Sequence, residues 1–310
     1  MTKLSVVIPV FNENELIKEL LRRVKINTEK ITQNYEIVLV DDGSSDSTWK
    51  IIESEAKLEK RIKAIKFSRN FGHHYAITAG LHEANSDWVV VMDGDLQDRP
   101  EVIPDLFNKA QEGFDIVFVS RQNRPETLLY RLAQKVFYSI LRFLSGIDFD
   151  SNQANFSIIS RKVVQAFRTF PENARFYGST IKWLGFNSSR VFADHGKRFS
   201  GRTSYTLKKR FKLAADIIIA FSARPLRFSI YLGILVSLRS FVGTIIITIN
   251  VISGSLKFLS WTSLMIIIFF LAGIILIILG LIGIYLGEIF REVKKRPLYI
   301  ICESINLNNE

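Results

Sequence analysis

The chain has 310 residues, 48% hydrophobic and 23% charged, so it suits one large domain or two modest ones and is not a disordered protein. Its 41 lysines and arginines against 30 acidic residues give a formal net charge of +11, compatible with nucleic acid, an anionic membrane surface or a phosphorylated substrate. Most of the apolar surplus follows Phe228, which excludes a purely soluble enzyme.

Short apolar runs alternate with segments of helical periodicity in the N-terminal part of the chain. The runs that predict buried strands are Leu4–Val10, Glu36–Val40, Ile62–Phe67, Trp88–Met92 and Ile116–Val119. Helical spacing of apolar residues occurs over residues 16–24 and 49–56, and residues 44–47 supply caps for the second of these helices. The alternation predicts an α/β fold with a doubly wound, mostly parallel sheet.

Polar motifs follow three of the predicted strands. Asn12–Glu13 follows the first strand, Asp41–Ser44 the second and Asp93–Asp95 the fourth. Ligands of doubly wound sheets collect at the carboxyl ends of the strands. We therefore expect these three clusters to converge at one edge of the sheet.

Asp93 and Asp95 form an Asp-x-Asp pair, and two such carboxylates can hold a hard divalent cation that neutralises a diphosphate. An EF-hand is excluded because the sixth position counted from Asp93 is Asp98 rather than glycine. The sequence lacks the Walker A, G-x-G-x-x-G and G-x-S-x-G fingerprints. The four histidines do not have zinc-site spacing, and we expect His73 and His74 at the surface or against a nucleotide.

Two amphipathic segments follow the predicted strands. Residues 127–145 carry apolar side chains on roughly one face and basic side chains among the other positions. This pattern is typical of a helix that lies on a membrane surface, and the alternative is a surface helix packed on the sheet. Residues 207–224 have a similar character.

Residues 228–253 and 262–287 are long apolar runs, each above the roughly 20 residues that cross a bilayer as a helix. The flanking basic residues are Arg224, Arg227, Arg291, Lys294, Lys295 and Arg296, whereas the connecting loop carries only Lys257. The positive-inside rule then predicts a multi-pass protein of the inner or plasma membrane with both termini in the cytoplasm. Two spans enclose no transport pathway without oligomerisation, which argues against a polytopic transporter.

The predicted organisation is a cytoplasmic head over residues 1–226, a transmembrane hairpin over residues 227–288 and a cytoplasmic basic tail over residues 289–310. The N-terminal apolar run is too short for a secretory signal. Cys302 is the only cysteine, so no intrachain disulfide forms, in agreement with a reducing compartment.

Arg239 lies about midway along the first apolar run. A lipid-facing arginine at this depth costs at least about 3 kcal/mol on insertion scales. We therefore expect it to face protein or a water-filled groove, either as a structural partner across the interface of a homo-oligomer or in contact with a lipid phosphate.

Four motifs occur in order, and further segments continue the pattern. They are Ser5–Glu13, Val40–Asp46, Ser68–Gly72 and Met92–Asp98, followed by Ser120–Arg121, Arg198, Gly201, the apolar hairpin and Glu292–Tyr299. Together they resemble the family-two glycosyltransferases, in particular the polyprenyl-phosphate glycosyltransferases, which include bactoprenol glucosyltransferases and dolichyl-phosphate mannose synthases. The resemblance spans nearly the whole chain and implies a GT-A fold.

The resemblance also implies a role for individual residues. The donor-binding residues would be Pro9, Asn12, Glu13 and Asp41 at the base of a nucleotide sugar and Asp93 near its ribose and diphosphate. Asp95 and Gln97 would ligate Mg²⁺ or Mn²⁺ together with the diphosphate. The acceptor lipid phosphate would be held by Arg121, Arg131 and Arg198, and the implied catalytic set is Asp93, Asp95, Arg121 and Arg198.

Two segments depart from the family pattern. Many bactoprenol-linked relatives carry Gly-Asp-Phe-Arg where this chain reads Ala154–Ser157, so the candidate catalytic carboxylate is replaced by Asn155 unless Asp150 or Asp148 takes its place. Residues 203–205 lack the lysine often found before the aromatic residue. Both departures concern the sugar identity and the acid–base roles.

The leading hypothesis is a metal-dependent enzyme that moves one sugar from a nucleotide sugar, with UDP as the expected carrier, to a polyprenyl phosphate at the cytoplasmic face. The acceptor phosphate is already ionised near neutrality, with a second pKa of ~6, so it can attack the anomeric carbon directly and invert it. The alternative is a membrane-anchored protein that binds nucleotide sugars or lipid phosphates without turnover. A processive polysaccharide synthase is disfavoured because the Gln-x-x-Arg-Trp segment of that group is absent from this sequence. A nucleic-acid-binding protein is disfavoured because the basic residues cluster at the membrane flanks.

Overall fold

The computed structural model describes residues 2–122, 136–137, 139–140, 142–145, 153–170, 176–194, 218–219, 222–253 and 261–307. The chain divides into two compact units. The first comprises Met1–Ile140, Ile147–Thr206 and Pro297–Glu310, and the second comprises Leu141–Gly146 and Leu207–Arg296.

A mixed β-sheet forms the centre of the first unit. Its described strands are β1 (Thr2–Val10), β2 (Tyr35–Asp41), β3 (Ile62–Phe67), β4 (Ser86–Val91), β5 (Ile116–Gln122), β6 (Gln153–Ser160), β7 (Ser188–Asp194) and β8 (Ile301–Ile305). They follow the order β7-β5-β6-β4-β1-β2-β3-β8. The pairs β1–β2, β1–β4, β2–β3 and β5–β7 are parallel, whereas β6 runs antiparallel to β4 and β5, and β8 to β3. The five predicted strands are therefore confirmed as β1 to β5.

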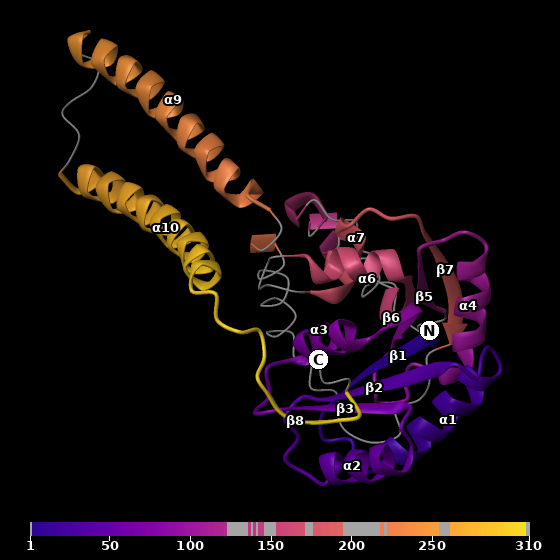
Figure 1. Ribbon diagram of the computed structural model, residues 1–310. Helices are drawn as coiled ribbons and strands as arrows, with labels where there is room; N and C mark the ends of the chain where they lie inside the picture. Colours follow the sequence, from indigo (N-terminus) through magenta and orange to yellow (C-terminus); the bar gives the residue numbers. More distant parts are fainter. Residues whose placement is uncertain are drawn as a thin grey trace. The chain divides into compact units, whose positions relative to one another are not determined.

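Helices cover both faces of the sheet, and each face has its own apolar core. Helices α1 (Ile17–Glu29), α2 (Thr48–Leu58) and α4 (Ile103–Gln111) pack on one face, and α3 (His73–Glu83), α6 (Arg161–Arg168) and α7 (Tyr177–Trp183) on the other (Figure 1). Because side chains of a strand alternate between faces, Val6 and Ile8 of β1 join the first core and Val7 joins the second.

Helices α1 and α2 confirm the two helices predicted from apolar spacing. Of the predicted cap residues 44–47, Asp46 makes the side-chain bond at the start of α2. Ser47 precedes the helix but makes no side-chain capping bond, and Asp46 accepts the backbone N–H of Thr48 at 2.9 Å instead. A carboxylate at this position also interacts favourably with the positive end of the helix dipole.

Two long helices form the hairpin of the second unit, α9 (Arg224–Ile252) and α10 (Trp261–Val293). The stretches Arg224–Gly243 and Ile267–Val293 are long and apolar enough to cross a membrane. Within this unit the Tyr285 hydroxyl donates to the Ser222 carbonyl at 2.7 Å. Arg239 is exposed on α9, so its predicted protein or lipid contact stays a prediction.

The predicted interfacial helices lie largely outside the described residues. Of the first one, the structure describes 136–137, 139–140 and 142–145, and these residues are helical. Val136, Ile140 and Phe143 are all exposed there, at a spacing that puts residues on one side of a helix. Of the second, the structure describes only 218–219 and 222–224, so its membrane contact stays a prediction.

The residues that follow α10 complete the edge of the sheet. β8 pairs with β3, and the Ser68 N–H donates to the Ile300 carbonyl at 3.0 Å. Tyr299 stacks on Phe67 with ring centroids 4.9 Å apart, and Glu303 forms an ion pair with Lys66 at 2.7 Å. The predicted basic tail thus contributes a strand to the first unit, which the sequence analysis did not anticipate.

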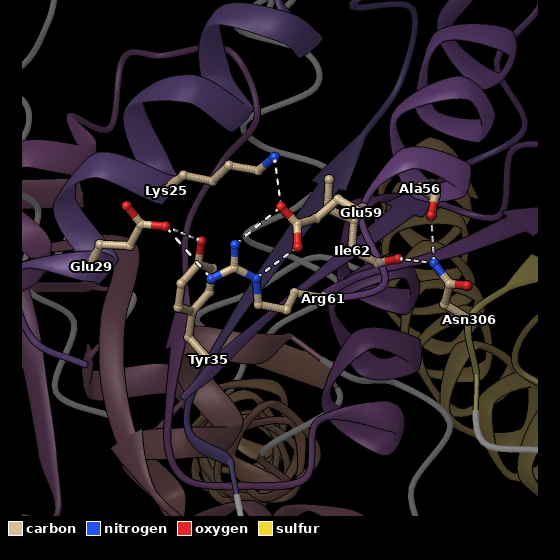
Figure 2. A network of polar contacts seen from close by, with 8 residues as sticks. All are labelled: Lys25, Glu29, Tyr35, Ala56, Glu59, Arg61, Ile62 and Asn306. Atoms are coloured by element: carbon tan, nitrogen blue, oxygen red, sulfur yellow. Dashed lines mark hydrogen bonds and ion pairs between the residues drawn. The ribbon is translucent and has the colours of Figure 1, made fainter. Parts of the chain in front are cut away.

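Asn306 joins the end of β8 to two other elements. Its Nδ2 donates to the carbonyl oxygens of Ala56 in α2 at 2.6 Å and of Ile62 in β3 at 2.9 Å (Figure 2). The same view shows Arg61 between the carboxylates of Glu59 and Glu29, with Arg61 Nε 2.7 Å from Glu59 Oε1. These contacts tie the start of β3 to α1 and α2.

Replacement of Asn306 by alanine removes both hydrogen bonds and leaves the two carbonyl oxygens without that partner. The free energy of unfolding is expected to fall by about 1–3 kcal/mol. Thermal unfolding of the purified full-length chain measures the effect, with Asn108→Ala on the exposed side of α4 as the matched control. Equal midpoints for both variants would contradict a stabilising role of Asn306.

Candidate active site

The carboxyl ends of β1, β2 and β4 meet at one edge of the sheet, as the sequence predicted. Backbone hydrogen bonds fix the three ends to one another, from Asp42 N–H to the Val10 carbonyl at 2.9 Å and from Met92 N–H to the Val7 carbonyl at 3.1 Å. The donor-binding candidates Pro9, Asn12, Glu13, Asp41 and Asp93 all lie on or directly after these strands. The structure therefore brings this predicted set together.

A polar cluster joins the segment after β1 to the segment after β2. Asp41 Oδ1 accepts the Ser44 backbone N–H at 3.1 Å and the Ser44 hydroxyl. Ser44 Oγ accepts the Asn12 N–H at 2.9 Å, and Asn12 Oδ1 accepts the Ser45 N–H at 2.9 Å. Asn12 has a φ of 54°, a left-handed conformation that asparagine tolerates better than most residues. The two segments are thus held in one arrangement.

Asp41 keeps one carboxylate oxygen unused within this cluster. The residue is fully buried, and Oδ2 has no hydrogen-bond partner among the described residues. Burial raises the pKa of Asp41, and the two hydrogen bonds from Ser44 counteract this rise. A buried acceptor without a partner is costly, so Oδ2 is suited to accept an N–H from a ligand.

Asp42 faces away from this cluster and anchors the loop that precedes α3. Its Oδ1 accepts the backbone N–H of Phe71 at 2.8 Å, and its Oδ2 accepts that of Gly72 at 3.0 Å. Burial raises the pKa of Asp42, while the bonds from Phe71 and Gly72 lower it. Because Gly72 directly precedes α3, Asp42 sets where that helix begins.

The Asp-x-Asp turn is pressed against the end of β1. A Cβ added to Gly94 would lie 2.7 Å from Val10 Cγ1 and 3.1 Å from the Pro9 carbonyl oxygen, so only glycine fits between the two aspartates. Leu96 has a φ of 58°, although it is almost fully buried in the core. Burial of this leucine holds a backbone conformation that is uncommon for its type. The turn is therefore fixed from both sides.

The two predicted metal ligands contact each other. The Gln97 backbone N–H donates to Asp95 Oδ1 at 3.0 Å, and Gln97 Nε2 donates to Asp95 Oδ2 at 2.7 Å. Carboxylate and amide oxygens are the ligands that Mg²⁺ and Mn²⁺ prefer. No group of three or more His, Cys, Asp or Glu residues suited to a metal ion occurs in the described part of the chain. The oxygen ligands that Asp95 and Gln97 offer thus fit a divalent ion that takes its remaining ligands from a diphosphate and water.

His73, at the start of α3, completes this edge of the sheet. Its Nε2 lies 3.2 Å from Asp93 Oδ1 and 3.4 Å from Asn155 Nδ2 of β6. Burial lowers the pKa of His73, but Asp93, Asp42 and Asp98 outweigh it and raise the value. The sequence predicts a surface position or a nucleotide contact for His73 but gives no signal for its contact with Asp93.

His74 has a packing role instead. Its Nδ1 accepts the Tyr177 backbone N–H at 3.4 Å, and its ring packs edge-on against Phe176. Burial lowers the pKa of His74 to about 3, so the ring is neutral. The residue joins α3 to the start of α7, a role that the sequence analysis did not anticipate.

Comparison with known proteins identifies the family. The sequence pattern of glycosyl transferase family 2 matches residues 5–168, which contain the whole edge described above. The chain belongs to glycosyl transferase family 2. Its family-two resemblance, inferred from motifs, is thus confirmed.

Two relatives match nearly the full length of the chain. A prophage bactoprenol glucosyl transferase homolog of Escherichia coli is 36% identical over 96% of this chain and 98% of its own length. An undecaprenyl-phosphate 4-deoxy-4-formamido-L-arabinose transferase of Proteus mirabilis is 31% identical over 99% of this chain and 95% of its own length.

A solved structure has a similar fold. Glucosyl-3-phosphoglycerate synthase of Mycobacterium tuberculosis, crystallised with Mn²⁺, UDP and phosphoglyceric acid, matches with a TM-score of 0.52 and 19% identity, over 70% of this chain and 76% of that one. The mixed sheet with helices on both faces is therefore a GT-A-like fold, as predicted.

The residues predicted to hold the acceptor phosphate lie mostly outside the described residues. Arg131, Arg198, Asp148 and Asp150 all fall there. Arg121 belongs to β5 and pairs with Ala193 of β7 through its backbone. It directly follows Ser120, which pairs with Gln153 at the start of β6. Arg121 thus lies at the same end of the sheet as Asn155, and its phosphate contact stays a prediction.

Proposed function

We propose that this protein transfers one sugar from a UDP-sugar to a polyprenyl phosphate, such as undecaprenyl or dolichyl phosphate, and inverts the anomeric centre. The observation that carries the proposal is the Asp-x-Asp turn, fixed beside the buried carboxylate of Asp41 at one edge of a GT-A-like sheet. The acceptor class comes from the two full-length relatives, whose names specify bactoprenol and undecaprenyl phosphate.

Different residues at the edge of the sheet bind different parts of the nucleotide sugar. Asp41 Oδ2 accepts a ring N–H of the base, since this oxygen is buried and has no partner among the described residues. Asp93 lies near the ribose and diphosphate. Asp95 and the side-chain carbonyl oxygen of Gln97 would hold Mg²⁺ or Mn²⁺, and the bound ion would supply positive charge that offsets the negative charge of the departing nucleoside diphosphate.

The acceptor needs little help from a base. A phosphomonoester is largely ionised near neutral pH, with a second pKa of ~6. One of its oxygens forms the bond to the anomeric carbon as the bond from that carbon to the diphosphate breaks, and UDP leaves. Arg121, Arg131 and Arg198 orient the phosphate, because a guanidinium fork matches its oxygens. Positioning of the acceptor phosphate and electrostatic stabilisation account for most of the rate acceleration.

The reaction takes place at the cytoplasmic face of a membrane. Helices α9 and α10 form the anchor, and the basic residues that flank the hairpin stay on the cytoplasmic side with the head, residues 1–226. The exposed apolar residues Val136, Ile140 and Phe143 rest on the lipid surface, where a long isoprenoid acceptor presents its phosphate.

A donor screen tests this function directly. Purified full-length protein is incubated with undecaprenyl phosphate, Mn²⁺ and a panel of UDP- and GDP-sugars, and the lipid product is identified by mass spectrometry. We expect one or a few UDP-sugars to give a polyprenyl monophosphate that carries a single sugar, and no product when EDTA replaces Mn²⁺. Nucleotide binding without transfer across the panel would favour the alternative, a membrane-anchored binding protein.

A further inference from the structure

Three charged residues form a row across the neighbouring strands β2, β3 and β8. Asp41 of β2 pairs in register with Lys66 of β3, and Lys66 pairs in register with Glu303 of β8. Residues that pair in register point to the same face of a sheet. Here it is the face that α1, α2 and α4 cover, because the side chains two positions away in the three strands pack in its core. One lysine therefore stands between two carboxylates, each one strand away.

Of these two carboxylates, Lys66 contacts that of Glu303. Its Nζ lies 2.7 Å from Glu303 Oε1 and 5.5 Å from the centre of the Trp49 ring. On the other side, the fully buried Asp41 Oδ2 has no hydrogen-bond partner among the described residues. Neighbouring strands are roughly 4.8 Å apart, and the flexible stem of a lysine spans that distance in either direction. The ion pair with Glu303 thus decides which carboxylate Lys66 occupies.

A second donor fixes the carboxylate of Glu303. Trp49 Nε1 donates to Glu303 Oε2 at 2.9 Å, so each oxygen of the carboxylate has its own partner. Trp49 is buried in the first turn of α2, directly after Thr48, whose hydroxyl accepts the Glu13 N–H at 2.9 Å. Strand β8 is thereby joined to the same turn of α2 that holds the donor-binding segment after β1.

The role of this ion pair lies in where it holds the lysine. The side chains of Lys66 and Glu303 are 25% and 48% exposed, and an ion pair with this much solvent contact stabilises a fold only slightly. The hydrogen bond to Glu303 raises the pKa of Lys66, so the lysine carries its charge at neutral pH. If Glu303 were lost, this ammonium group could turn to Asp41 Oδ2 and take the place of a ligand N–H.

We propose that Glu303 keeps Lys66 away from Asp41 and so leaves Asp41 Oδ2 open to an N–H group of the donor's base. Glu303 is then a positioning residue that acts through Lys66, and the segment that follows the hairpin takes part in nucleotide binding. This inference rests on the proposed function because it assigns Asp41 to the base.

Replacement of Glu303 by glutamine tests the positioning role. Glu303→Gln keeps the size of the side chain but removes its charge and one acceptor oxygen. The Kd for UDP in the presence of Mn²⁺, measured by calorimetry, is expected to rise about 5-fold, the upper range for one exposed ion pair. The donor KM should rise with it, while kcat changes little. Glu53→Gln, which breaks the ion pair with Lys57 on α2, is the matched control and should bind UDP like the wild type.

A change at Lys66 separates positioning from a structural effect. Lys66→Met has no ammonium group to place on Asp41 and is expected to bind UDP about as tightly as the wild type. In this background Glu303→Gln is expected to add nothing, because the competing charge is already gone. The proposal is overturned if Glu303→Gln alone binds UDP as tightly as the wild type, or if the double variant binds as weakly as Glu303→Gln.

Inorganic pyrophosphate separates an effect at Asp41 from an effect on the Asp-x-Asp turn, because it has no base. The affinity for pyrophosphate with Mn²⁺ is expected to be the same in the wild type and in Glu303→Gln. An equal loss of affinity for pyrophosphate and for UDP would contradict an action of Glu303 through Asp41.

The same titrations distinguish failure of this inference from failure of the proposed function. If the wild type binds UDP with Mn²⁺ but transfers no sugar, the proposed transfer is wrong, while the affinity ranking of the variants still decides the inference. If the wild type transfers sugar and Glu303→Gln binds UDP equally well, the positioning role is wrong and the transfer function stands. A wild type that does not bind UDP would overturn both.

Discussion

Replacement of Asp95 by alanine is expected to lower sugar transfer to polyprenyl phosphate by about 100- to 1000-fold, the cost of losing one group that stabilises transition-state charge. Asp95 is the carboxylate whose two oxygens both face Gln97, so its removal leaves the amide as the only predicted protein ligand of the ion. The rate of product formation with purified lipid, at saturating Mn²⁺, measures the effect.

Two comparisons make the Asp95 result specific. Asp105→Ala removes an exposed carboxylate from the first turn of α4 and is expected to leave transfer unchanged. Asp95→Ala should keep the thermal midpoint of the wild type within a few degrees, because Gly94 and Leu96 still hold the turn after the bonds between Asp95 and Gln97 are lost. Normal turnover of a folded Asp95→Ala protein would show that the assigned metal role is wrong.

Replacement of Gly43 by alanine is expected to damage both the fold and the donor site. Gly43 has a φ of +70°, and its added Cβ would lie 2.4 Å from the Arg69 carbonyl carbon and 2.7 Å from the Asn70 nitrogen. Both atoms are backbone, so the clash cannot be relieved by turning a side chain. We expect a loss of stability above about 3 kcal/mol, more than backbone strain alone costs.

Gly113→Ala is the matched control for this clash. Gly113 also has a left-handed φ, +101°, but nothing lies within 4 Å of its added Cβ. The difference in thermal midpoint between the two variants therefore isolates the contact with the loop before α3 from the cost of the φ angle. The Gly43→Ala variant should also bind UDP more weakly than the wild type, since Gly43 lies in the loop that begins at Asp41. Equal midpoints and equal UDP affinities would contradict this account.

The donor half of the edge could be predicted from the sequence because its signals are local. β1 to β4 are apolar runs in a parallel arrangement, and such strands deliver the residues that follow them to one edge. Asn12, Asp41 and Asp93 could therefore be grouped from the sequence alone. The glycines at positions 43 and 94 supply the close approaches that the motif needs.

The strands β6, β7 and β8 could not be predicted, because each pairs with strands that lie far away in the sequence. β6 enters the sheet antiparallel between β4 and β5, and β8 reaches the edge of β3 only after the hairpin. The β8 residues Ile301–Ile305 include a cysteine, a glutamate and a serine, and their partner is more than 230 residues earlier. The contact between His73 and Asp93 depends on the same long-range placement of α3 and β4.

The central claim is that the ends of β1, β2 and β4 bind a nucleotide sugar with a divalent cation. A crystal or cryo-electron-microscopy structure of the full-length chain with UDP and Mn²⁺ tests it most directly. We expect the base within hydrogen-bond distance of Asp41 Oδ2 and the ion on Asp95, in contact with diphosphate oxygens. Nucleotide bound away from this edge, or an ion held by other side chains, would contradict it.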